Sequence, residues 1–581
     1  METIKKQKCT EEIPLFISRS SITTEINKTG SWRFARPKYD EKTSPCSAAC
    51  PAGEDIARIQ MLVNQELFED AIHTILIENP FPAVCGRVCF HPCETACNRT
   101  DLDEPIAIQG LERFLGDFAI QESIKLPSQK LPDNGKSVCI AGAGPAGLAA
   151  GYFLTRLGYS CHVFEASTEP GGILRWGIPE YRLPAKVLKS EIERLKNFGV
   201  KIYCNAPVSQ NSFKEAKEHY DAFFIGCGYS RSMQMNIPGE KAAFDGLEFL
   251  SNMRRGEIAP LTGTAAVVGG GNTAVDVARS LVRLGVKTII IYRRRQQDMP
   301  AFKHEVEMAV KEGVEILELV VPIQIEKTNS ACFLTLQQMK ISGTETSGGK
   351  AVVVPDGRVT QLLRVQQVFT AIGAEPAEPW QFPPEQDPET LHLSHSTFAC
   401  RDNPFLFGGD LTNPIKSVTD AIASGKQAAM ALDTFFKKGW DANADRLAPY
   451  RLGNGPALSM ASYMERKQTN RNRHIVSYDE INTDYFLSAS RVKAPSLSAD
   501  ESSQSFLETE KTYTFDQTRQ ETQRCFKCGV CNECDNCRIF CPEVAVVFKN
   551  SRREINLDYC KGCGICVVEC PRNAMALEVE R

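Results

Sequence analysis

The sequence predicts a multidomain α/β protein with a cysteine-rich segment near each end, on three observations. Residues 138–165 and 265–292 each read as strand, glycine-rich turn, helix and strand, the pattern of a parallel βαβ unit. Of the 23 cysteines, seven precede residue 98, ten follow residue 524 and six are scattered between. A length of 581 residues is enough for about three to five domains.

The composition narrows the class of protein and its compartment. With 42% hydrophobic and 24% charged residues it is typical of a soluble globular protein. The net charge of −4 argues against nucleic-acid binding. The longest apolar run contains the first glycine-rich turn and predicts no membrane span, and the polar N-terminus predicts no signal peptide. We therefore expect a cytoplasmic protein whose clustered cysteines bind metal in a reducing compartment.

The first glycine-rich turn follows a buried strand at residues 138–141. Gly142 permits a tight turn, Gly144 lets the backbone approach a pyrophosphate, and Gly147 lets helix and strand pack closely. The helix N-terminus then faces the phosphates. Glu165 ends the second strand, where a carboxylate accepts hydrogen bonds from a ribose 2′-OH and repels a 2′-phosphate, so FAD or NAD is favoured. The predicted cofactor-binding residues are Gly142, Gly144, Pro145, Ala146, Gly147 and Glu165.

The second turn has the same pattern but a different residue after its second strand. Ala274 replaces the third glycine, which the motif allows. The strand at 287–292 is followed by three arginines, whose guanidinium groups would pair with a 2′-phosphate. The domain is therefore predicted to bind NADP(H), with NAD(H) left possible. The predicted contacts are Gly270, Gly271, Asn272, Thr273, Arg293 and Arg294, with Ala371, Ile372 and Gly373 closing the domain.

The C-terminal segment contains two copies of C-x₂-C-x₂-C-x₃-C-P, the pattern of bacterial two-cluster ferredoxins. The fourth cysteine of each run ligates the other cluster. One [4Fe-4S] cluster is therefore predicted to bind Cys531, Cys534, Cys537 and Cys570, and the other Cys560, Cys563, Cys566 and Cys541. Zinc is the weaker alternative, because it needs no Cys-Pro repeat. Cys525 and Cys528 are surplus to this pattern and either ligate a further metal or extend the register.

Six cysteines near the N-terminus lie among stretches of helical periodicity. Their Cys-x-x-x-Cys spacing can direct thiolates to one centre, and soft thiolates favour an iron–sulfur cluster or zinc. The stretch resembles the N-terminal helical iron–sulfur domain of the glutamate synthase small subunit and of dihydropyrimidine dehydrogenase. The same domain occurs in the large subunit of NADH-dependent ferredoxin–NADP oxidoreductase.

This resemblance implies a [4Fe-4S] cluster near the flavin, held by three cysteines and one glutamate or glutamine. The residues that match its motif are Cys50, Cys89, Cys93 and Glu112. Cys46 and Cys97 match a second cluster of that family but lack half of its ligands, since only the distant Cys9 lies upstream. Cys85 matches a position that is not a ligand. We expect at least one N-terminal cluster.

The resemblance also implies where FAD is bound beyond the first turn. A Gly-Gly stretch is expected to wrap the flavin, and Arg182 matches an FAD contact. The segment around Asp410 resembles the wider flavin disulfide-reductase-like superfamily, in which this aspartate holds the ribityl chain; from its residue type alone Asp410 could instead cap the following helix. From its residue type alone, Arg182 is as consistent with a surface ion pair as with an FAD contact. The helix after Asp410 is expected to point its N-terminus at the isoalloxazine. The predicted contacts in these segments are Gly172, Ile173, Arg182, Gly409, Asp410, Ser417, Val418 and Thr419.

The predicted fold is an N-terminal all-α iron–sulfur domain, two Rossmann-like α/β nucleotide-binding domains and a C-terminal α+β ferredoxin domain. The NADP domain is inserted in the FAD domain. About the first 40 residues are read as an irregular arm, and the linker is expected to wrap the body. The predicted boundaries are 1–125 (helical iron–sulfur), 136–258 and 376–438 (FAD), 259–375 (NAD(P)H), 439–515 (linker) and 516–581 (ferredoxin).

These parts predict an NAD(P)H:acceptor oxidoreductase that passes electrons through FAD and [4Fe-4S] clusters. No Cys-x-x-Cys pair lies between residues 98 and 524, which argues against a thiol–disulfide reductase. The expected partner is a ferredoxin or the catalytic subunit of a redox complex, which implies a hetero-oligomer. No catalytic side chain is assigned. Two alternatives stay open: a non-catalytic electron-wiring subunit and an electron-bifurcating flavoprotein subunit.

Overall fold

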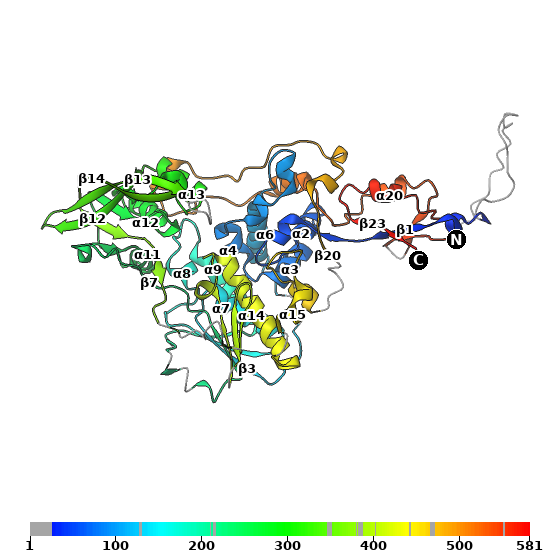
Figure 1. Cartoon of the computed structure of the whole chain (residues 1–581), viewed down its shortest axis with the longest axis horizontal. Helices are drawn as coiled ribbons and strands as arrows, with labels where there is room; N and C mark the ends of the chain where they lie inside the picture. Colours follow the sequence, from blue (N-terminus) through cyan, green and yellow to red (C-terminus); the bar gives the residue numbers. More distant parts are fainter. Residues whose placement is uncertain are drawn as a thin grey trace.

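The computed structural model describes residues 26–580, except 127–129, 210, 213–215, 345–350, 379, 381–386, 388, 401–402, 441–442, 465–470 and 550–551. Cys9 lies outside the described residues. The molecule is elongated (Figure 1). The second nucleotide-binding domain lies at one end, the C-terminal module lies at the other, and the N-terminal helices lie between them.

The first nucleotide-binding domain is built on a seven-stranded sheet of order β17-β18-β19-β6-β3-β4-β5. The strands from β19 to β5 run parallel, and β17 and β18 add an antiparallel edge. Helix α14 packs along α7. The bounds are β3 (Ser137–Ala141), α7 (Pro145–Arg156), β4 (Ser160–Phe164), α8 (Ile173–Trp176), α9 (Ala185–Phe198), β5 (Lys201–Tyr203), β6 (Ala222–Ile225), β17 (Thr390–His392), β18 (Thr397–Cys400), β19 (Pro404–Phe407), η6 (Gly409–Leu411) and α14 (Val418–Lys438).

The second domain is inserted between β6 and β17 and has a parallel sheet of order β11-β10-β9-β15-β8. A separate antiparallel sheet, β12-β13-β14, packs beside it. The bounds are β7 (Arg231–Ser232), η4 (Glu240–Ala242), β8 (Phe244–Asp245), α11 (Gly246–Arg255), β9 (Thr264–Val268), α12 (Asn272–Arg283), β10 (Lys287–Tyr292), η5 (Gln296–Asp298), α13 (Lys303–Lys311), β11 (Glu315–Glu318), β12 (Val320–Lys327), β13 (Cys332–Thr344), β14 (Ala351–Val365), β15 (Gln367–Thr370) and β16 (Ala374–Glu375). Both predicted Rossmann-like domains are confirmed.

Short helices form the N-terminal part, and their apolar faces join the core of the first nucleotide-binding domain. One continuous cluster of buried side chains includes Ile72 and Leu111 from the helices and Leu148 and Ile422 from α7 and α14. This shared core holds the cysteine-bearing helices rigidly against the first domain. The bounds are α1 (Pro45–Ala49), α2 (Ile56–Asn64), α3 (Phe68–Glu78), α4 (Pro82–Val88), α5 (Pro92–Thr95), η3 (Asn98–Asp101) and α6 (Ile108–Gln121).

The C-terminal module incorporates a strand from the other end of the chain. Strand β1 (Ala35–Tyr39) pairs antiparallel with β23 (Met575–Val579). The reading of residues 1 to about 40 as an irregular arm is therefore wrong for 35–39, because an exposed edge strand offers unpaired backbone groups that β1 satisfies. The other elements are η2 (Thr29–Trp32), α18 (Phe515–Arg524), α19 (Asn536–Ile539), β21 (Val546–Lys549), β22 (Arg552–Ile555) and α20 (Ile565–Val568).

The segment between α14 and α18 runs back over the body as a strap (Figure 1). Thr509 N–H donates to Tyr181 O at 3.0 Å, and Glu508 Oε1 accepts from Arg87 Nε at 2.6 Å. The strap therefore contacts both the first nucleotide-binding domain and the N-terminal helices. Its elements are α15 (Asn443–Leu447), η7 (Ala448–Tyr450), α16 (Met460–Tyr463), β20 (Asn472–Ile475), which pairs with β2 (Lys42–Thr43), η8 (Tyr478–Glu480), η9 (Thr483–Tyr485) and α17 (Ala499–Ser503).

Candidate cofactor and metal sites

The first glycine-rich loop joins β3 to α7. Gly142 has a φ of +95°, and a Cβ on Gly147 would lie 1.9 Å from Gly142 O, so neither position tolerates a side chain. A Cβ on Gly144 would meet no atom within 4 Å. Pro145 and Ala146 then begin α7. The N-terminus of α7 therefore faces open space, as a pyrophosphate site requires.

Glu165 lies directly after β4 and is buried. Its Oε2 accepts from Ala143 N at 2.8 Å, and its Oε1 accepts from Ser167 N at 2.9 Å. These bonds fix the carboxylate beside the first glycine-rich loop. Because each carboxylate oxygen can accept a further hydrogen bond, ribose hydroxyls can still be bound there.

A second glycine pair covers the first loop. Gly172 has a φ of +54°, and a Cβ added to it would lie 2.9 Å from Gly144 Cα. Ile173, the first residue of α8, is 41% exposed. A dinucleotide that crosses the first loop would therefore lie next to backbone without side chains.

Arg182 lies between the two nucleotide-binding domains. Its Nη1 donates to both oxygens of Asp276, at 3.0 and 2.8 Å, and its Nε is 3.1 Å from Glu305 Oε1. The alternative of a surface ion pair is wrong, because both Arg182 and Asp276 are buried. The pair joins the domains, and an FAD contact by Arg182 stays a prediction.

The second glycine-rich loop joins β9 to α12. Gly269 has a φ of +142°, and a Cβ on it would lie 2.2 Å from Ala371 O. A Cβ on Gly270 would lie 2.3 Å from the Tyr292 ring, whereas one on Gly271 would meet nothing within 4 Å. The open space again lies at a helix N-terminus. Asn272 and Thr273 begin α12, and Ala371, Ile372 and Gly373 follow β15 beside the loop.

The three arginines after β10 have different surroundings. Arg293 is exposed and forms no ion pair with any residue that the structure describes. Arg294 Nε donates to Ala351 O at 2.7 Å, and Arg295 Nε donates to Asp298 Oδ2 at 2.8 Å. Of the three, Arg293 is therefore the most available to a bound phosphate.

The second flavin segment lies between β19 and α14. Gly409 has a φ of +66°, and its N–H donates to Ser424 Oγ at 2.7 Å. Burial raises the pKa of Asp410, while the charge of Lys416 lowers it. Ser417 caps α14 by accepting from Asp420 N at 3.0 Å. Val418 and Thr419 form the first turn of this helix.

The N-terminal residues Cys50, Cys89, Cys93 and Glu112 come from four helical segments, and all are buried. Burial and, to a smaller extent, the charge of Glu112 raise the pKa of the Cys89 thiol to about 12. Burial raises the pKa of Cys50, to which the charges of Cys89 and Glu112 add. Three thiols and a carboxyl that disfavour each other's charge are a donor set that a cationic metal centre would stabilise.

Two features of this site were not predicted. Thr419 Oγ1 donates to Cys89 Sγ at 2.9 Å, which joins the first turn of α14 to the cysteine site. Glu54 shares Asn79 with Glu112, since Asn79 Nδ2 lies 2.8 Å from Glu54 and 3.2 Å from Glu112. Burial raises the pKa of Glu54 to about 7.

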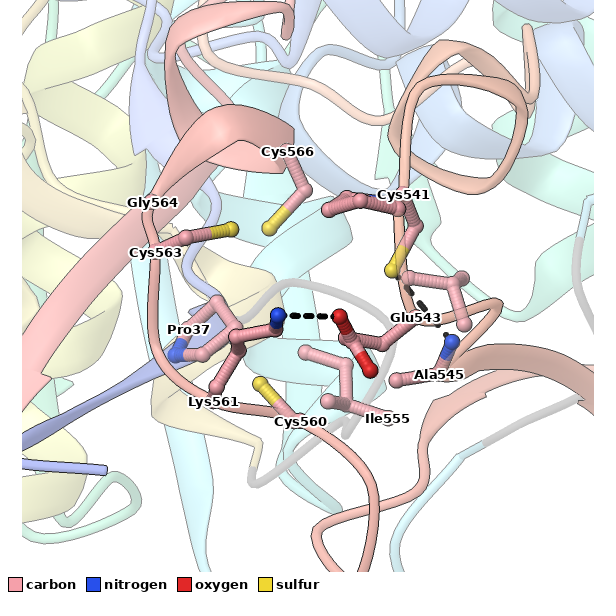
Figure 2. A pocket seen from close by; sticks show the side chains of 12 residues that line it. Pro37, Cys541, Glu543, Ala545, Ile555, Cys560, Lys561, Cys563, Gly564 and Cys566 are labelled. Carbon is pink, nitrogen blue, oxygen red and sulfur yellow. Dashed lines mark hydrogen bonds and ion pairs between the residues drawn. The ribbon is translucent and has the colours of Figure 1, made fainter. Parts of the chain in front are cut away.

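The C-terminal cysteines line two pockets. Cys541, Cys560, Cys563 and Cys566 surround one of about 350 Å³, partly open to solvent (Figure 2). Cys531, Cys534, Cys537 and Cys570 surround the other, of about 360 Å³. Each pocket thus combines three cysteines of one run with the last cysteine of the other. Ala545 N donates to Cys541 Sγ and Ala574 N to Cys570 Sγ, both at 3.3 Å.

None of the described cysteines forms a disulfide. Among the described residues no three His, Cys, Asp or Glu side chains converge as they would around a single metal ion. In a cluster each cysteine binds a different iron, so its ligands stand farther apart than those of one ion.

Comparisons with known proteins assign the family. The chain is 31% identical over 400 residues to the NAD-dependent dihydropyrimidine dehydrogenase subunit PreT of Escherichia coli, which spans 68% of this chain and 91% of PreT. The chain belongs to the FAD- and iron–sulfur-dependent pyridine-nucleotide oxidoreductases. The family described as pyridine nucleotide-disulphide oxidoreductase matches residues 136–390 of this oxidoreductase. Dihydropyrimidine dehydrogenase domain II, 4Fe-4S cluster, matches 35–124, and the 4Fe-4S binding domain matches 553–576.

Two further relatives are matched over only part of their own length. The NADP(+)-dependent formate dehydrogenase subunit beta of Moorella thermoacetica is 34% identical over 432 residues, 68% of this chain and 60% of the relative. The NADPH-Fe(3+) oxidoreductase subunit beta of Geobacter sulfurreducens is 34% identical over 348 residues, 58% of this chain and 52% of the relative. The chain thus spans little more than half of these two relatives.

The family confirms the predicted classes of cofactor. FAD, a pyridine nucleotide and [4Fe-4S] clusters are the cofactors of this oxidoreductase, with iron–sulfur domains on both sides of the nucleotide-binding domains. The open glycine loops and the cysteine-lined pockets fit these groups. Within the described residues, no helix is both long and apolar enough to cross a membrane.

Proposed function

We propose that this chain transfers electrons between NADPH and a partner redox protein through FAD and [4Fe-4S] clusters, in the reducing cytoplasm. The partner is a ferredoxin or the catalytic subunit of a hetero-oligomeric redox complex. Bound FAD supplies the conversion between hydride transfer and single-electron transfer. The names of the relatives, which are subunits that use NADP(H) or NAD(H), support this proposal.

The hydrogen bond from Thr419 Oγ1 to Cys89 Sγ is the observation that carries the proposal. Thr419 lies in the first turn of α14, where the flavin ring is expected, and Cys89 is a proposed ligand of the N-terminal cluster. Both residues are buried. The two proposed sites are therefore joined by one hydrogen bond between buried side chains.

The other proposed ligands and contacts have defined tasks. Cys50, Cys89, Cys93 and Glu112 hold the N-terminal cluster. The two C-terminal sets of four cysteines hold one cluster each. The first loop and Glu165 bind the FAD diphosphate and ribose, and the second loop orients NADPH against the flavin. Arg293 and Arg294 bind the 2′-phosphate, which selects NADPH over NADH.

Anaerobic stopped-flow spectroscopy tests this function. NADPH should bleach the flavin absorbance and then the cluster absorbance, and NADH should do so only at higher concentration. Replacing Arg293 and Arg294 with Gln should weaken the binding of NADPH about tenfold to a hundredfold, since charge-assisted hydrogen bonds contribute about 1.5–3 kcal/mol. The affinity for NADH should change little.

Arg295→Gln is the matched control, because Arg295 is already paired with Asp298. It should leave the ratio of the two nucleotide affinities unchanged. Equal losses for NADPH and NADH in the Arg293/Arg294 variant would refute the phosphate contact. Absence of any nucleotide-dependent bleaching would favour a non-catalytic electron-wiring subunit.

A further inference from the structure

Four cysteines have no role in the sites described so far: Cys46, Cys97, Cys525 and Cys528. In the sequence they form two incomplete pairs, separated by more than four hundred residues. In the structure, Cys46 lies in α1, Cys97 lies directly before η3, and Cys525 lies directly after α18. Cys528 is buried, and the other three are partly buried.

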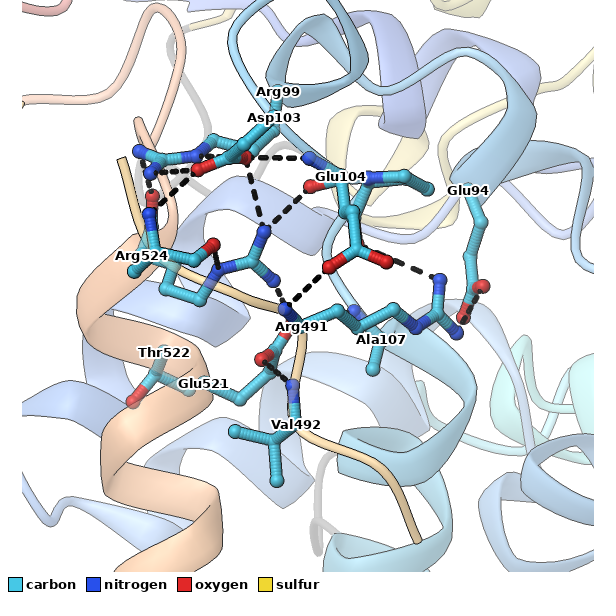
Figure 3. Close-up of polar contacts among 12 residues, drawn as sticks. Glu94, Arg99, Asp103, Glu104, Ala107, Arg491, Val492, Glu521, Thr522 and Arg524 are labelled. Atoms are coloured by element: carbon cyan, nitrogen blue, oxygen red, sulfur yellow. Dashed lines mark hydrogen bonds and ion pairs between the residues drawn. The ribbon is translucent and has the colours of Figure 1, made fainter. Parts of the chain in front are cut away.

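A buried polar clamp links the residues that follow Cys97 to α18, the helix that precedes Cys525 (Figure 3). Arg99 Nη1 donates to Arg524 O at 2.9 Å, and Arg524 Nη2 donates to Asp103 Oδ1 at 3.0 Å. Glu521 Oε1 accepts from Ala107 N at 2.8 Å. Arg99 is two residues after Cys97 and Arg524 is one residue before Cys525, so this clamp fixes the two cysteine segments against each other.

The contacts extend to the sulfur atoms. Asn98 Nδ2 donates to Cys528 Sγ at 3.6 Å and to Val476 O at 3.0 Å. Lys527 N donates to Cys525 Sγ at 3.3 Å, which repeats the 3.3 Å bond from His91 N to Cys89 Sγ at the N-terminal site. In both cases the donor is two residues after the cysteine, a backbone turn that stabilises negative charge on sulfur.

The segment that carries Cys46 lies against the same C-terminal turn. Lys42 N donates to Gly529 O at 2.9 Å, and Cys531 N donates to Glu41 Oε1 at 3.3 Å. Helix α1, which carries Cys46, packs against α5, which ends two residues before Cys97. Cys46 therefore lies on the same side of the N-terminal helices as Cys97, next to the turn that carries Cys528.

We propose that Cys46, Cys97, Cys525 and Cys528 together ligate a fourth [4Fe-4S] cluster, assembled from the two ends of the chain. Four thiols are the donor set of such a cluster, and soft thiolates select iron–sulfur or zinc.

The proposed site lies between the proposed N-terminal cluster and the C-terminal clusters. Cys46 is four residues from Cys50, Cys97 is four residues from Cys93, and Cys528 is three residues from Cys531. Three residues span at most about 11 Å of extended chain. The site therefore lies beside a ligand of each neighbouring cluster. As an electron relay, this cluster would move one electron at a time and no atoms. This role rests on the proposed function, whereas the ligand set is independent of it.

Metal analysis of the full-length protein, purified without oxygen, tests the ligand set. Four clusters predict about sixteen iron atoms per FAD, against about twelve for three clusters. The Cys525→Ser/Cys528→Ser double variant should lose about four iron atoms and one low-temperature EPR signal. Cys400→Ser, at a half-buried cysteine in β18, is the matched control and should keep all of the iron.

Twelve iron atoms in the wild-type protein, or one zinc that the double variant loses, would overturn the proposal. The wild-type iron count and Mössbauer spectrum decide the question even if the double variant does not fold, and Cys46→Ser provides a milder change. Flavin bleaching by NADPH should stay within about twofold of the wild-type rate in the double variant, and reduction of an added ferredoxin should fall at least tenfold. Failure of bleaching in the wild type would instead contradict the proposed function and leave the iron count standing.

Discussion

The N-terminal cysteine site and the C-terminal pockets use the same kind of donor in opposite surroundings. Cys50, Cys89 and Cys93 are each at most 9% exposed, in a core shared with the first nucleotide-binding domain. In the C-terminal module Cys534 and Cys563 are exposed, and both pockets open to solvent. A partner protein can approach an exposed site directly, whereas the surrounding protein separates a buried site from a partner.

This difference gives the proposed path a direction in space. The buried site contacts α14 through Thr419, and the C-terminal module, whose cysteines line the exposed pockets, lies at one end of the molecule (Figure 1). The donors also differ, since a carboxyl replaces one thiol in the buried set. On the proposed function, the same cysteine chemistry would serve an internal relay and an external outlet, because packing, and not ligand type, sets the access.

The largest effect is expected from Cys93→Ala. It should remove the N-terminal cluster, about four iron atoms per chain, while NADPH still bleaches the flavin. Reduction of an added ferredoxin should fall to background because the internal relay is broken. Cys85→Ala is the matched control, since Cys85 is buried in the same core and is not a predicted ligand. Equal loss of iron in both variants would mean that the buried site is not selective for the predicted ligands.

Exposure should decide the order in which clusters are destroyed. Under ferricyanide and EDTA, the C-terminal clusters should lose iron at least about tenfold faster than the N-terminal cluster, because oxidation of cysteine sites follows exposure. EPR spectra recorded through the reaction separate the two phases, and the Cys93→Ala spectrum assigns the slow one. A single rate for all clusters would remove the distinction between a buried and an exposed site.

A smaller effect is expected from Thr419→Val. It removes the hydrogen bond to Cys89 Sγ, and hydrogen bonds to sulfur raise cluster potentials. A contribution of about 1 kcal/mol corresponds to about 40 mV for a one-electron couple, so the N-terminal potential should fall by that amount. Thr434→Val, in the same helix, is the control. Redox titration followed by EPR measures the cluster potential in both variants. An unchanged potential in Thr419→Val would contradict coupling between α14 and the cysteine site.

The smallest effect concerns the strap between α14 and α18. It contacts the N-terminal helices and also reaches α13 of the second nucleotide-binding domain. His304 Nε2 lies 3.2 Å from Glu510 Oε1. The hydrogen bond to Glu510 raises the pKa of His304, although burial opposes it. Because its pKa is raised, protonated His304 stabilises docking of the strap onto α13 fully below the ordinary histidine pKa of about 6.5. This stabilisation is lost as the pH rises through the pKa that His304 has in the folded protein. Glu510 stays ionised over this range, also beside Arg113.

Proteolysis within residues 496–510 should therefore be faster at pH 9 than at pH 6, by an amount that corresponds to less than about 1 kcal/mol. Low-salt buffers should enlarge the difference. His304→Gln should abolish this pH dependence, after correction for the protease's own profile. A pH dependence that persists in the variant would assign the effect to another group.

Much of the fold and of the local sites could be predicted from the sequence, because the signals lie in short segments. The positive φ at Gly142 and Gly269 follows from turns that only glycine adopts easily, and the two Rossmann-like domains follow from those turns. The crossed sets of C-terminal cysteines follow from a fixed spacing. The pairing of β1 with β23 could not be predicted, since five residues carry no signal for a partner at the other end of the chain.

The sequence by itself determined the classes of cofactor, because glycine turns, acidic and basic strand ends and cysteine spacing act within a few residues of one another. Only the tertiary structure decided how these parts are joined. It placed Arg182 against Asp276, Thr419 against Cys89, and the Asn98 segment against Cys528 across 430 residues. Such contacts depend on how whole domains pack, and the free energy of that packing is spread over many side chains and not written in any one motif.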